Sequence, residues 1–185
     1  MEKTYDLIII GAGSAGLMAA AEAGRLKLEA LVLEGRHEPG SKLLMCGGGR
    51  CNVTNARISD KDYSSGCLHT LRHVLRNFSI KDAVSFFEQH GAPLVLQKDG
   101  CYFSADDKAR TILNALTGAA AAGGVSVRCG AVVNSIAVQD GVFNVVGNNF
   151  IERGRSVLVT TGGLSYPATG SDGSGYRFAE SFGHQ

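Results

Sequence analysis

Three glycines near the N-terminus have the spacing of a phosphate-binding turn. Gly11, Gly13 and Gly16 fit the pattern G-x-G-x-x-G, with Ser14 and Ala15 completing the turn. In such a turn the first glycine permits the tight bend, the second lets the backbone approach a pyrophosphate, and the third lets helix and strand pack closely. The helix that follows presents free N–H groups and a positive dipole end to the phosphates.

The elements around the turn match those of a dinucleotide-binding βαβ unit. An acid, Glu34, lies 18 residues beyond the last glycine, where its carboxylate would accept hydrogen bonds from a ribose and repel a 2′-phosphate. FAD or NAD is therefore favoured over NADP. The alternative is a βαβ unit whose glycines serve packing alone. The expected elements are a strand over 5–10, an Ala-rich helix over 17–26 and a strand over 30–33.

A second glycine cluster ends at Gly49 and is followed by Arg50, Cys51 and Asn52. Three consecutive glycines disfavour regular structure because each loses much backbone entropy on folding. They would instead bring backbone N–H groups close to a ligand. Arg50 would then pair with a phosphate, and Asn52 would hydrogen-bond a flavin ring edge or ribityl chain. The alternative is a flexible surface loop.

Two cysteines in this region raise a different chemistry. Cys46 and Cys51 have the C-x4-C spacing of the redox disulfide in glutathione-reductase-like flavoenzymes. The intervening glycines and Arg50 would interrupt the helix on which those enzymes hold the pair. Arg50 would, however, lower the pKa of a neighbouring thiol. A dithiol oxidoreductase therefore stays open as an alternative, beside the simpler reading of two small buried thiols.

A third glycine pair follows an apolar run over 156–160, which predicts a buried strand. Thr161, Gly162 and Gly163 come directly after this strand, and the glycine pair suits a close approach of the backbone to a cofactor. Tyr166 follows in the same block. Tyr166 and Arg50 are candidates for acid–base chemistry, but no catalytic residue is assigned.

The rest of the chain predicts an α/β fold. We expect a mostly parallel sheet with a short antiparallel meander, and ligand chemistry at the carboxyl ends of the strands. The further helices are expected over 68–78, 80–90 (capped by Ser79), about 105–122 and 173–182, and the further strands over 94–96, 101–103, 125–128, 131–138 and 142–146.

Composition excludes several classes of protein. The chain has 185 residues, 44% of them hydrophobic, which suffices for a buried core. With 18 basic and 17 acidic residues, the net charge of +1 gives no electrostatic case for nucleic acid or an anionic membrane. No apolar run is long enough for a membrane span, and the five histidines form no metal pattern. Acids at Glu2 and Asp6 argue against a secretion signal, so the five cysteines are expected to be reduced in the cytoplasm.

Three sequence blocks together resemble one flavoprotein family. They read GAGSAG over 11–16, GGGRCNVTN over 47–55 and TGGLSYPATGSDGSGYRFAESFGH over 161–184. In these blocks the chain is similar to the BaiN/YhiN-type NAD(P)/FAD-dependent oxidoreductases. That family includes aminoacetone oxidase and is distantly similar to glutathione-reductase-type flavoproteins. The resemblance spans essentially the whole chain and implies a Rossmann-like FAD-binding domain with a parallel central sheet and a β-meander.

The resemblance also implies roles for individual residues. FAD would lie at the first glycine turn, with Glu34 at the AMP ribose and the backbone of Val133 at the adenine edge. Thr161, Gly162 and Gly163 would close over the cofactor. Residues on the flavin side would be Lys42, Gly49, Arg50, Cys51 and Asn52. The expected substrate is a small molecule. NAD(P)H is a candidate electron donor, although the chain has no second G-x-G-x-x-G for it.

The family's members are longer than this chain. They continue with an inserted substrate domain and then a C-terminal segment that completes the FAD domain. Residues 1–185 are therefore expected to form the N-terminal part of the FAD-binding domain, with the substrate domain and the C-terminal segment absent. The expected activity is hydride or electron transfer through FAD. The alternative is a non-catalytic fragment that binds FAD only with a partner or the missing half, and self-association is a further expectation.

Overall fold

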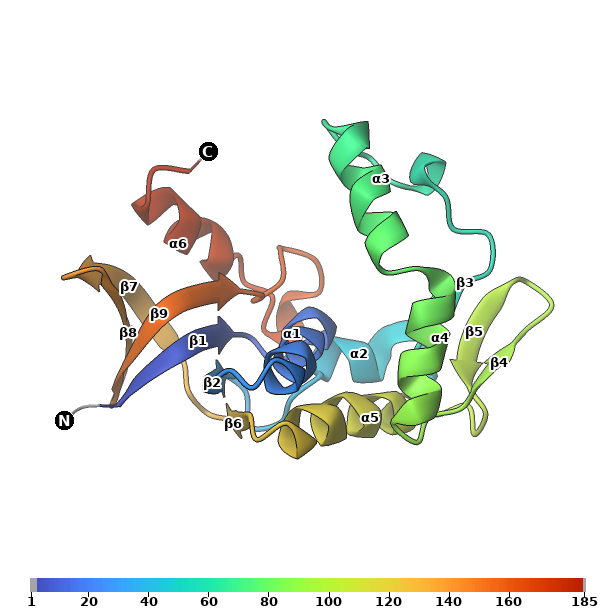
Figure 1. The fold of residues 1–185 in the computed structure, drawn as a ribbon, viewed down its shortest axis with the longest axis horizontal. Helices are drawn as coiled ribbons and strands as arrows, with labels where there is room; N and C mark the ends of the chain where they lie inside the picture. Colours follow the sequence, from blue (N-terminus) through green and yellow to red (C-terminus); the bar gives the residue numbers. More distant parts are fainter. Residues whose placement is uncertain (1–2, 185) are drawn as a thin grey trace. The chain divides into compact units, whose positions relative to one another are not determined.

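The computed structural model describes residues 3–184, which form two compact units (Figure 1). The first unit joins the N-terminal part of the chain, as far as Leu43, to the part from Leu116 onwards. The second unit comprises Leu44–Ala115. Each unit has its own sheet, and the two are described separately.

The first unit is built on a six-stranded sheet with the order β6-β2-β1-β9-β8-β7. β6, β2, β1 and β9 run parallel, and β9, β8 and β7 form an antiparallel meander. This confirms the predicted Rossmann-like, mostly parallel sheet. The strands are β1 (Thr4–Ile10), β2 (Ala30–Leu33), β6 (Ser126–Arg128), β7 (Val133–Gln139), β8 (Val142–Gly147) and β9 (Ile151–Val159).

The core of the first unit surrounds β1 and β2. All four residues of β2 are buried, as expected for a strand covered on both faces. Ile8, Ile10, Leu31 and Leu33 belong to one apolar cluster with Val145 of the meander and Phe178 of α6 (Ser174–Ser181). The helix α1 (Ser14–Arg25) contacts β1 and β2 and buries Leu17 and Ala20. These layers hold the carboxyl ends of β1 and β9 in place.

The second unit contains short helices and a three-stranded antiparallel sheet. α2 (Ser41–Met45) carries the chain into this unit, and α5 (Ala109–Ala122) carries it back to the first. Ser79 caps α4 together with Asp82, as the sequence predicts for its N-cap. The sheet has the order β3-β5-β4. The other elements are the turn Cys46–Gly49, β3 (Thr54–Asn55), the turn Asp60–Asp62, α3 (Leu68–Asn77), α4 (Ile80–Gln89), β4 (Leu94–Leu96) and β5 (Cys101–Ser104).

One strand boundary differs clearly from the prediction. β9 begins at Ile151 rather than at residue 156. Arg153 pairs with Asn144 of β8 on one side and with Thr4 of β1 on the other, so the strand first closes the meander and then continues beside β1. The meander turn itself is as expected, because Asp140 and Gly141 both have the positive φ of a tight hairpin turn. None of the helices formed by residues 3–184 is both long and apolar enough to cross a membrane.

Candidate functional site

The first glycine turn connects β1 to α1 and depends on glycine at two positions. Gly11 has φ +102°, and a Cβ built on it would lie 2.6 Å from the carbonyl oxygen of Thr160. A Cβ on Gly16 would overlap the carbonyl oxygen of Gly11 and lie 2.7 Å from Thr160 Oγ1. Alanine at either position would therefore force backbone apart at the meeting point of β1, α1 and the end of β9.

The N-terminus of α1 is open. Gly13 is its N-cap residue, and no side chain caps the helix there. A Cβ built on Gly13 would meet no atom within 4 Å, so the turn leaves free space in front of the helix. The N–H groups that begin α1 and the positive end of its dipole face this space, as a bound anion requires.

Glu34 at the end of β2 braces the glycine turn. Its Oε2 accepts a hydrogen bond from the backbone N–H of Ala12 at 2.7 Å, and its Oε1 accepts one from the N–H of Arg36 at 2.9 Å. Each carboxylate oxygen has a further lone pair. The expected hydrogen bond to a ribose hydroxyl therefore stays a prediction. The carboxylate also has a structural role, because it accepts hydrogen bonds from the backbone of the glycine turn and of the segment after β2.

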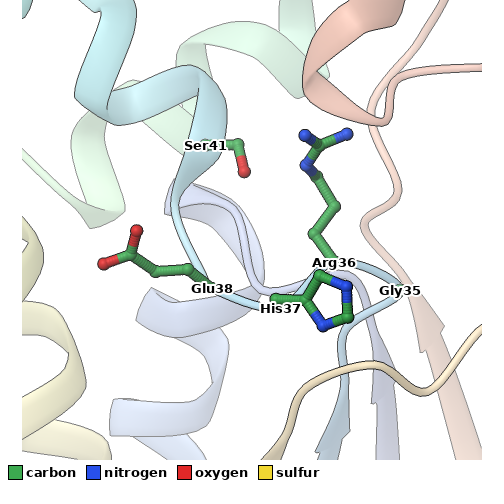
Figure 2. A pocket seen from close by; sticks show the side chains of 5 residues that line it. All are labelled: Gly35, Arg36, His37, Glu38 and Ser41. Atoms are coloured by element: carbon green, nitrogen blue, oxygen red, sulfur yellow. The ribbon is translucent and has the colours of Figure 1, made fainter.

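The segment after Glu34 lines an open hollow of ≈ 380 Å³ (Figure 2). The lining is polar and charged, so it suits a hydrophilic part of a ligand. None of the residues that line the hollow was among the predicted site residues. The same segment is tied to the glycine turn, because the N–H of Gly40 donates to the carbonyl of Ala12 at 2.9 Å. The lining residues are Gly35, Arg36, His37, Glu38 and Ser41.

The segment that leads into β7 is hydrogen-bonded to the segment that follows β2. The N–H of Ala131 donates to the carbonyl of Glu34 at 2.8 Å, and the N–H of Gly130 donates to that of Arg36 at 2.7 Å. Val133 is the first residue of β7 and stands opposite Gly147, next to an irregularity in the register. Val133 lies two residues beyond Ala131, and its predicted contact with the adenine edge stays a prediction.

Thr160 at the end of β9 joins two of the predicted regions. Its Oγ1 lies 3.0 Å from the carbonyl oxygen of Ile10 and 2.9 Å from that of Gly11, and its N–H donates to Ile10 at 2.8 Å. Thr161 and Gly162 follow directly, the latter with φ +80°. Thr160 was not among the predicted site residues, although a hydroxyl at a strand end next to a glycine pair is a signal that the sequence offers.

Lys42 anchors the turn that follows Gly163. Its ammonium donates to the carbonyl of Ser165 at 2.8 Å, and its Nζ lies 3.4 Å from Ser165 Oγ. A Cβ on Gly162 would lie 2.7 Å from Ser171 Oγ and 3.7 Å from Lys42 Nζ, so the glycine allows this approach. Lys42, Thr161, Gly162 and the first glycine turn are therefore brought together within the first unit.

The second glycine cluster lies in the second unit. Gly47, Gly48 and Gly49 all have positive φ, which confirms that they form no regular helix. Arg50 is paired here: its Nη2 lies 2.6 Å from Asp107 Oδ1, and its guanidinium stacks 4.2 Å from the centre of the Phe103 ring. This pairing was not predicted from the sequence, and the predicted phosphate contact of Arg50 stays a prediction.

Two further residues of this cluster are held inside the second unit. The amide Nδ2 of Asn52 lies 3.2 Å from Cys101 Sγ. Cys51 is buried, and the N–H of Cys51 donates to the carbonyl of Cys46 at 3.0 Å. Both cysteines are free thiols, with Cys46 exposed. Within the described residues no group of three or more His, Cys, Asp and Glu side chains could hold a metal ion.

The expectation that Arg50 activates a neighbouring thiol is wrong for Cys51. Burial, together with the nearby Cys46, raises the pKa of this thiol to about 11. Arg50 is engaged by Asp107 and does not offset the burial. A dithiol mechanism would need a ready thiolate at this position, which Cys51 does not provide.

We therefore expect Cys51 to react slowly with iodoacetamide. At pH 8 a thiol with a pKa near 11 is only about one part in a thousand thiolate. Mass spectrometry of the timed reaction should show alkylation of the exposed Cys46 at least about tenfold faster than that of Cys51. Equal rates at the two positions would contradict this and reopen the dithiol alternative.

Comparisons with known proteins agree with this geometry. The family model described as the HI0933-like protein Rossmann domain matches residues 5–185. The ribosomal RNA dihydrouridine synthase of Escherichia coli K12 is 35% identical over 183 residues, which are 99% of this chain and 45% of that protein. The 3-dehydro-bile acid delta(4,6)-reductase of Clostridium scindens is 30% identical over 95% of this chain and 43% of its own length. This chain thus spans about half the length of these curated relatives.

A solved structure supports the fold in the same way. The 3-ketosteroid-Δ4-(5α)-dehydrogenase from Rhodococcus jostii RHA1 superposes with a TM-score of 0.65 at 15% identity, over 90% of this chain and 47% of that one. At that identity the likeness concerns the fold alone. The parallel sheet, the glycine turn with its acid and the match over residues 5–185 together lead to one conclusion: the chain belongs to the HI0933-like family, of which it carries the Rossmann domain.

Proposed function

We propose that the first unit binds FAD. The observation that carries the proposal is the open N-terminus of α1, where Gly13 leaves free space while Gly11 and Gly16 are packed against backbone. This arrangement suits a pyrophosphate held by backbone N–H groups. Glu34, at the adjoining strand end, suits a ribose without a 2′-phosphate, which favours FAD over NADP.

The other predicted residues fit around this centre as proposals. The backbone of Val133 would contact the adenine, and Thr161, Gly162 and Gly163 would lie along the cofactor. Lys42, with its ammonium already turned to Ser165, would stand on the flavin side. The roles of Gly49, Arg50, Cys51 and Asn52 on the flavin side stay predictions that the resemblance implies.

We further propose that the bound FAD serves an oxidoreductase. When bound, FAD supplies hydride transfer at its N5 position, while the protein supplies binding, orientation and tuning. The names of the bile acid reductase and the dihydrouridine synthase both describe reduction of a carbon–carbon double bond. In both reactions the double bond is conjugated to a carbonyl group. A hydride therefore adds to the double-bond carbon farther from the carbonyl, and a proton adds to the nearer carbon. The two electrons would come from a nicotinamide, with NAD(P)H as the candidate donor.

The substrate class divides into two candidates. The resemblance implies a small molecule, and the net charge of +1 gives no electrostatic case for nucleic acid. The 35% identity to a protein named for ribosomal RNA favours a uracil base in RNA instead. Two assays would separate these substrate classes. One measures the reduction of an unsaturated ketone by NADPH or NADH, and the other measures the formation of dihydrouridine in ribosomal RNA.

FAD binding is tested by the absorbance spectrum of the purified chain. We expect flavin bands near roughly 370 and 450 nm that persist after FAD is added and the protein is passed through gel filtration. A Gly13→Val variant, whose side chain would fill the space in front of α1, serves as the matched control and should emerge colourless. A wild-type chain that also emerges colourless would favour the alternative of a fragment that needs a partner or further chain to hold FAD.

A further inference from the structure

Three large apolar side chains stand exposed on α6 and on the connection that leads to it from β9. Leu164 is 68% exposed, Tyr166 69% and Tyr176 56%. The connection begins at the strand end where Thr160 Oγ1 lies 2.9 Å from the carbonyl oxygen of Gly11. Leu164 and Tyr166 follow this strand end along the chain, and all three side chains belong to the first unit.

Two glycines bring Leu164 and Tyr176 together. A Cβ on Gly173 would lie 2.7 Å from Leu164 Cδ2 and 3.5 Å from Tyr176 Cδ2, so both side chains lie over this glycine. A Cβ on Gly163 would lie 3.1 Å from the hydroxyl of Tyr176. Side chains at either glycine would push this apolar pair apart, so the backbone here is shaped to hold it.

Tyr166 is held in an unusual backbone conformation. Its φ of 56° is left-handed, which is uncommon for a bulky residue and requires support from its surroundings. That support comes from two directions. Thr169 donates through its hydroxyl at 2.7 Å and its N–H at 2.9 Å to the carbonyl of Tyr166, and Lys42 holds the preceding carbonyl, that of Ser165, at 2.8 Å.

The polar groups of this patch suit a ligand with a carbonyl. Within residues 3–184 no hydrogen bond to a protein group engages the phenolic hydroxyls of Tyr166 and Tyr176, so each can donate to an incoming acceptor. Aromatic and aliphatic side chains beside such donors match a flat, largely apolar ring that carries an oxygen acceptor. A conjugated, unsaturated carbonyl ring has both properties.

We propose that Leu164, Tyr166 and Tyr176 form the surface that binds the flat unsaturated ring of the reducible substrate. The proposal rests on the proposed function, because it is the position beside the cofactor site that gives the patch this task. Leu164 and Tyr176 supply apolar contact. The two phenols supply hydrogen bonds to the carbonyl that is conjugated to the reacting double bond.

Equilibrium dialysis of the chain against 4-androstene-3,17-dione and against uridine tests the proposal without relying on turnover. We expect one of these two probes to bind and its dissociation constant to rise about tenfold in Leu164→Ala and in Tyr176→Ala. Tyr176→Phe, which keeps the ring, should change it by no more than about threefold. Tyr63→Ala removes an exposed tyrosine of the second unit and should leave binding unchanged.

A further variant guards against a merely structural effect. Tyr166→Asn removes the ring but tolerates the left-handed backbone, so it should weaken the probe while circular dichroism and thermal unfolding stay as in the wild type. The proposal is overturned if neither probe binds, or if binding is the same in Leu164→Ala, Tyr176→Ala and Tyr166→Asn as in the wild type. The absorbance test of FAD binding is separate. If the chain does not hold FAD but still binds the probe, the result counts against the proposed function alone.

Discussion

Alanine at Gly16 is expected to unfold the first unit or to weaken it severely. The added Cβ would overlap the carbonyl oxygen of Gly11 and press on Thr160 Oγ1. The nearest obstacle is backbone of the glycine turn itself, which cannot rotate away as a flexible side chain would. We expect a loss of about 3 kcal/mol or more in the free energy of unfolding. Urea denaturation followed by circular dichroism measures it directly.

The matched change at Gly13 should separate stability from binding. A Cβ at Gly13 meets nothing within 4 Å and the residue has a negative φ, so Gly13→Ala and Gly13→Val should cost no more than about 1 kcal/mol of stability. Gly13→Val should nevertheless weaken FAD binding about a hundredfold, because it fills the space where the pyrophosphate would lie. Wild-type affinity in Gly13→Val would show that the cofactor does not lie there, and unchanged stability in Gly16→Ala would contradict the packing argument.

Replacing Glu34 with alanine should damage both the fold and the site. The carboxylate accepts the N–H groups of Ala12 and Arg36, and both would lose their partner. We expect a loss of about 1–3 kcal/mol in the free energy of unfolding and a weaker affinity for FAD, measured by thermal unfolding and by fluorescence titration with FAD.

Glu34→Gln provides the control for this change. Glutamine keeps one acceptor oxygen but turns an NH₂ group towards the other N–H, so its stability should fall between those of the wild type and Glu34→Ala. If Glu34→Ala is as stable as the wild type, the two hydrogen bonds do not brace the turn. If its stability falls while FAD affinity is unchanged, the carboxylate has the structural task alone.

Much of the first unit could be predicted because its signals are local. The apolar run ending at Ile10, the glycine turn and the Ala-rich helix follow one another directly, and each favours one structure by its own composition. The start of β9 could not be predicted in this way. Its first residues include Glu152, Arg153 and Arg155, which do not look like a strand until their partners are known. Glu152, for example, pairs with Arg128, 24 residues away, at 2.6 Å.

The same limit applies to the site. Sequence spacing identified Gly11, Gly16 and Glu34 as belonging to one motif, but the bracing of the turn by Thr160 joins residues 149 apart. The pairing of Arg50 with Asp107 likewise depends on how the second unit folds. Spacing indicates which residue types could meet a ligand. It does not say which of them the protein has already used to satisfy its own polar groups.

The pairing of β1 with β9 has a consequence for how the protein is made. Thr4 stands opposite Arg153 and Ile10 opposite Val159, so the two central strands meet only after nearly the whole described chain has been synthesised. At 5–20 residues per second, the ribosome adds the intervening residues over a time on the order of ten seconds. Throughout that time β1 lacks one of its two neighbouring strands. Its unpaired edge must then be prevented from pairing with the edge strands of other molecules. The glycine turn closes onto Thr160 only after β9 has been made, so cofactor capture should follow the synthesis of β9 rather than accompany that of the turn.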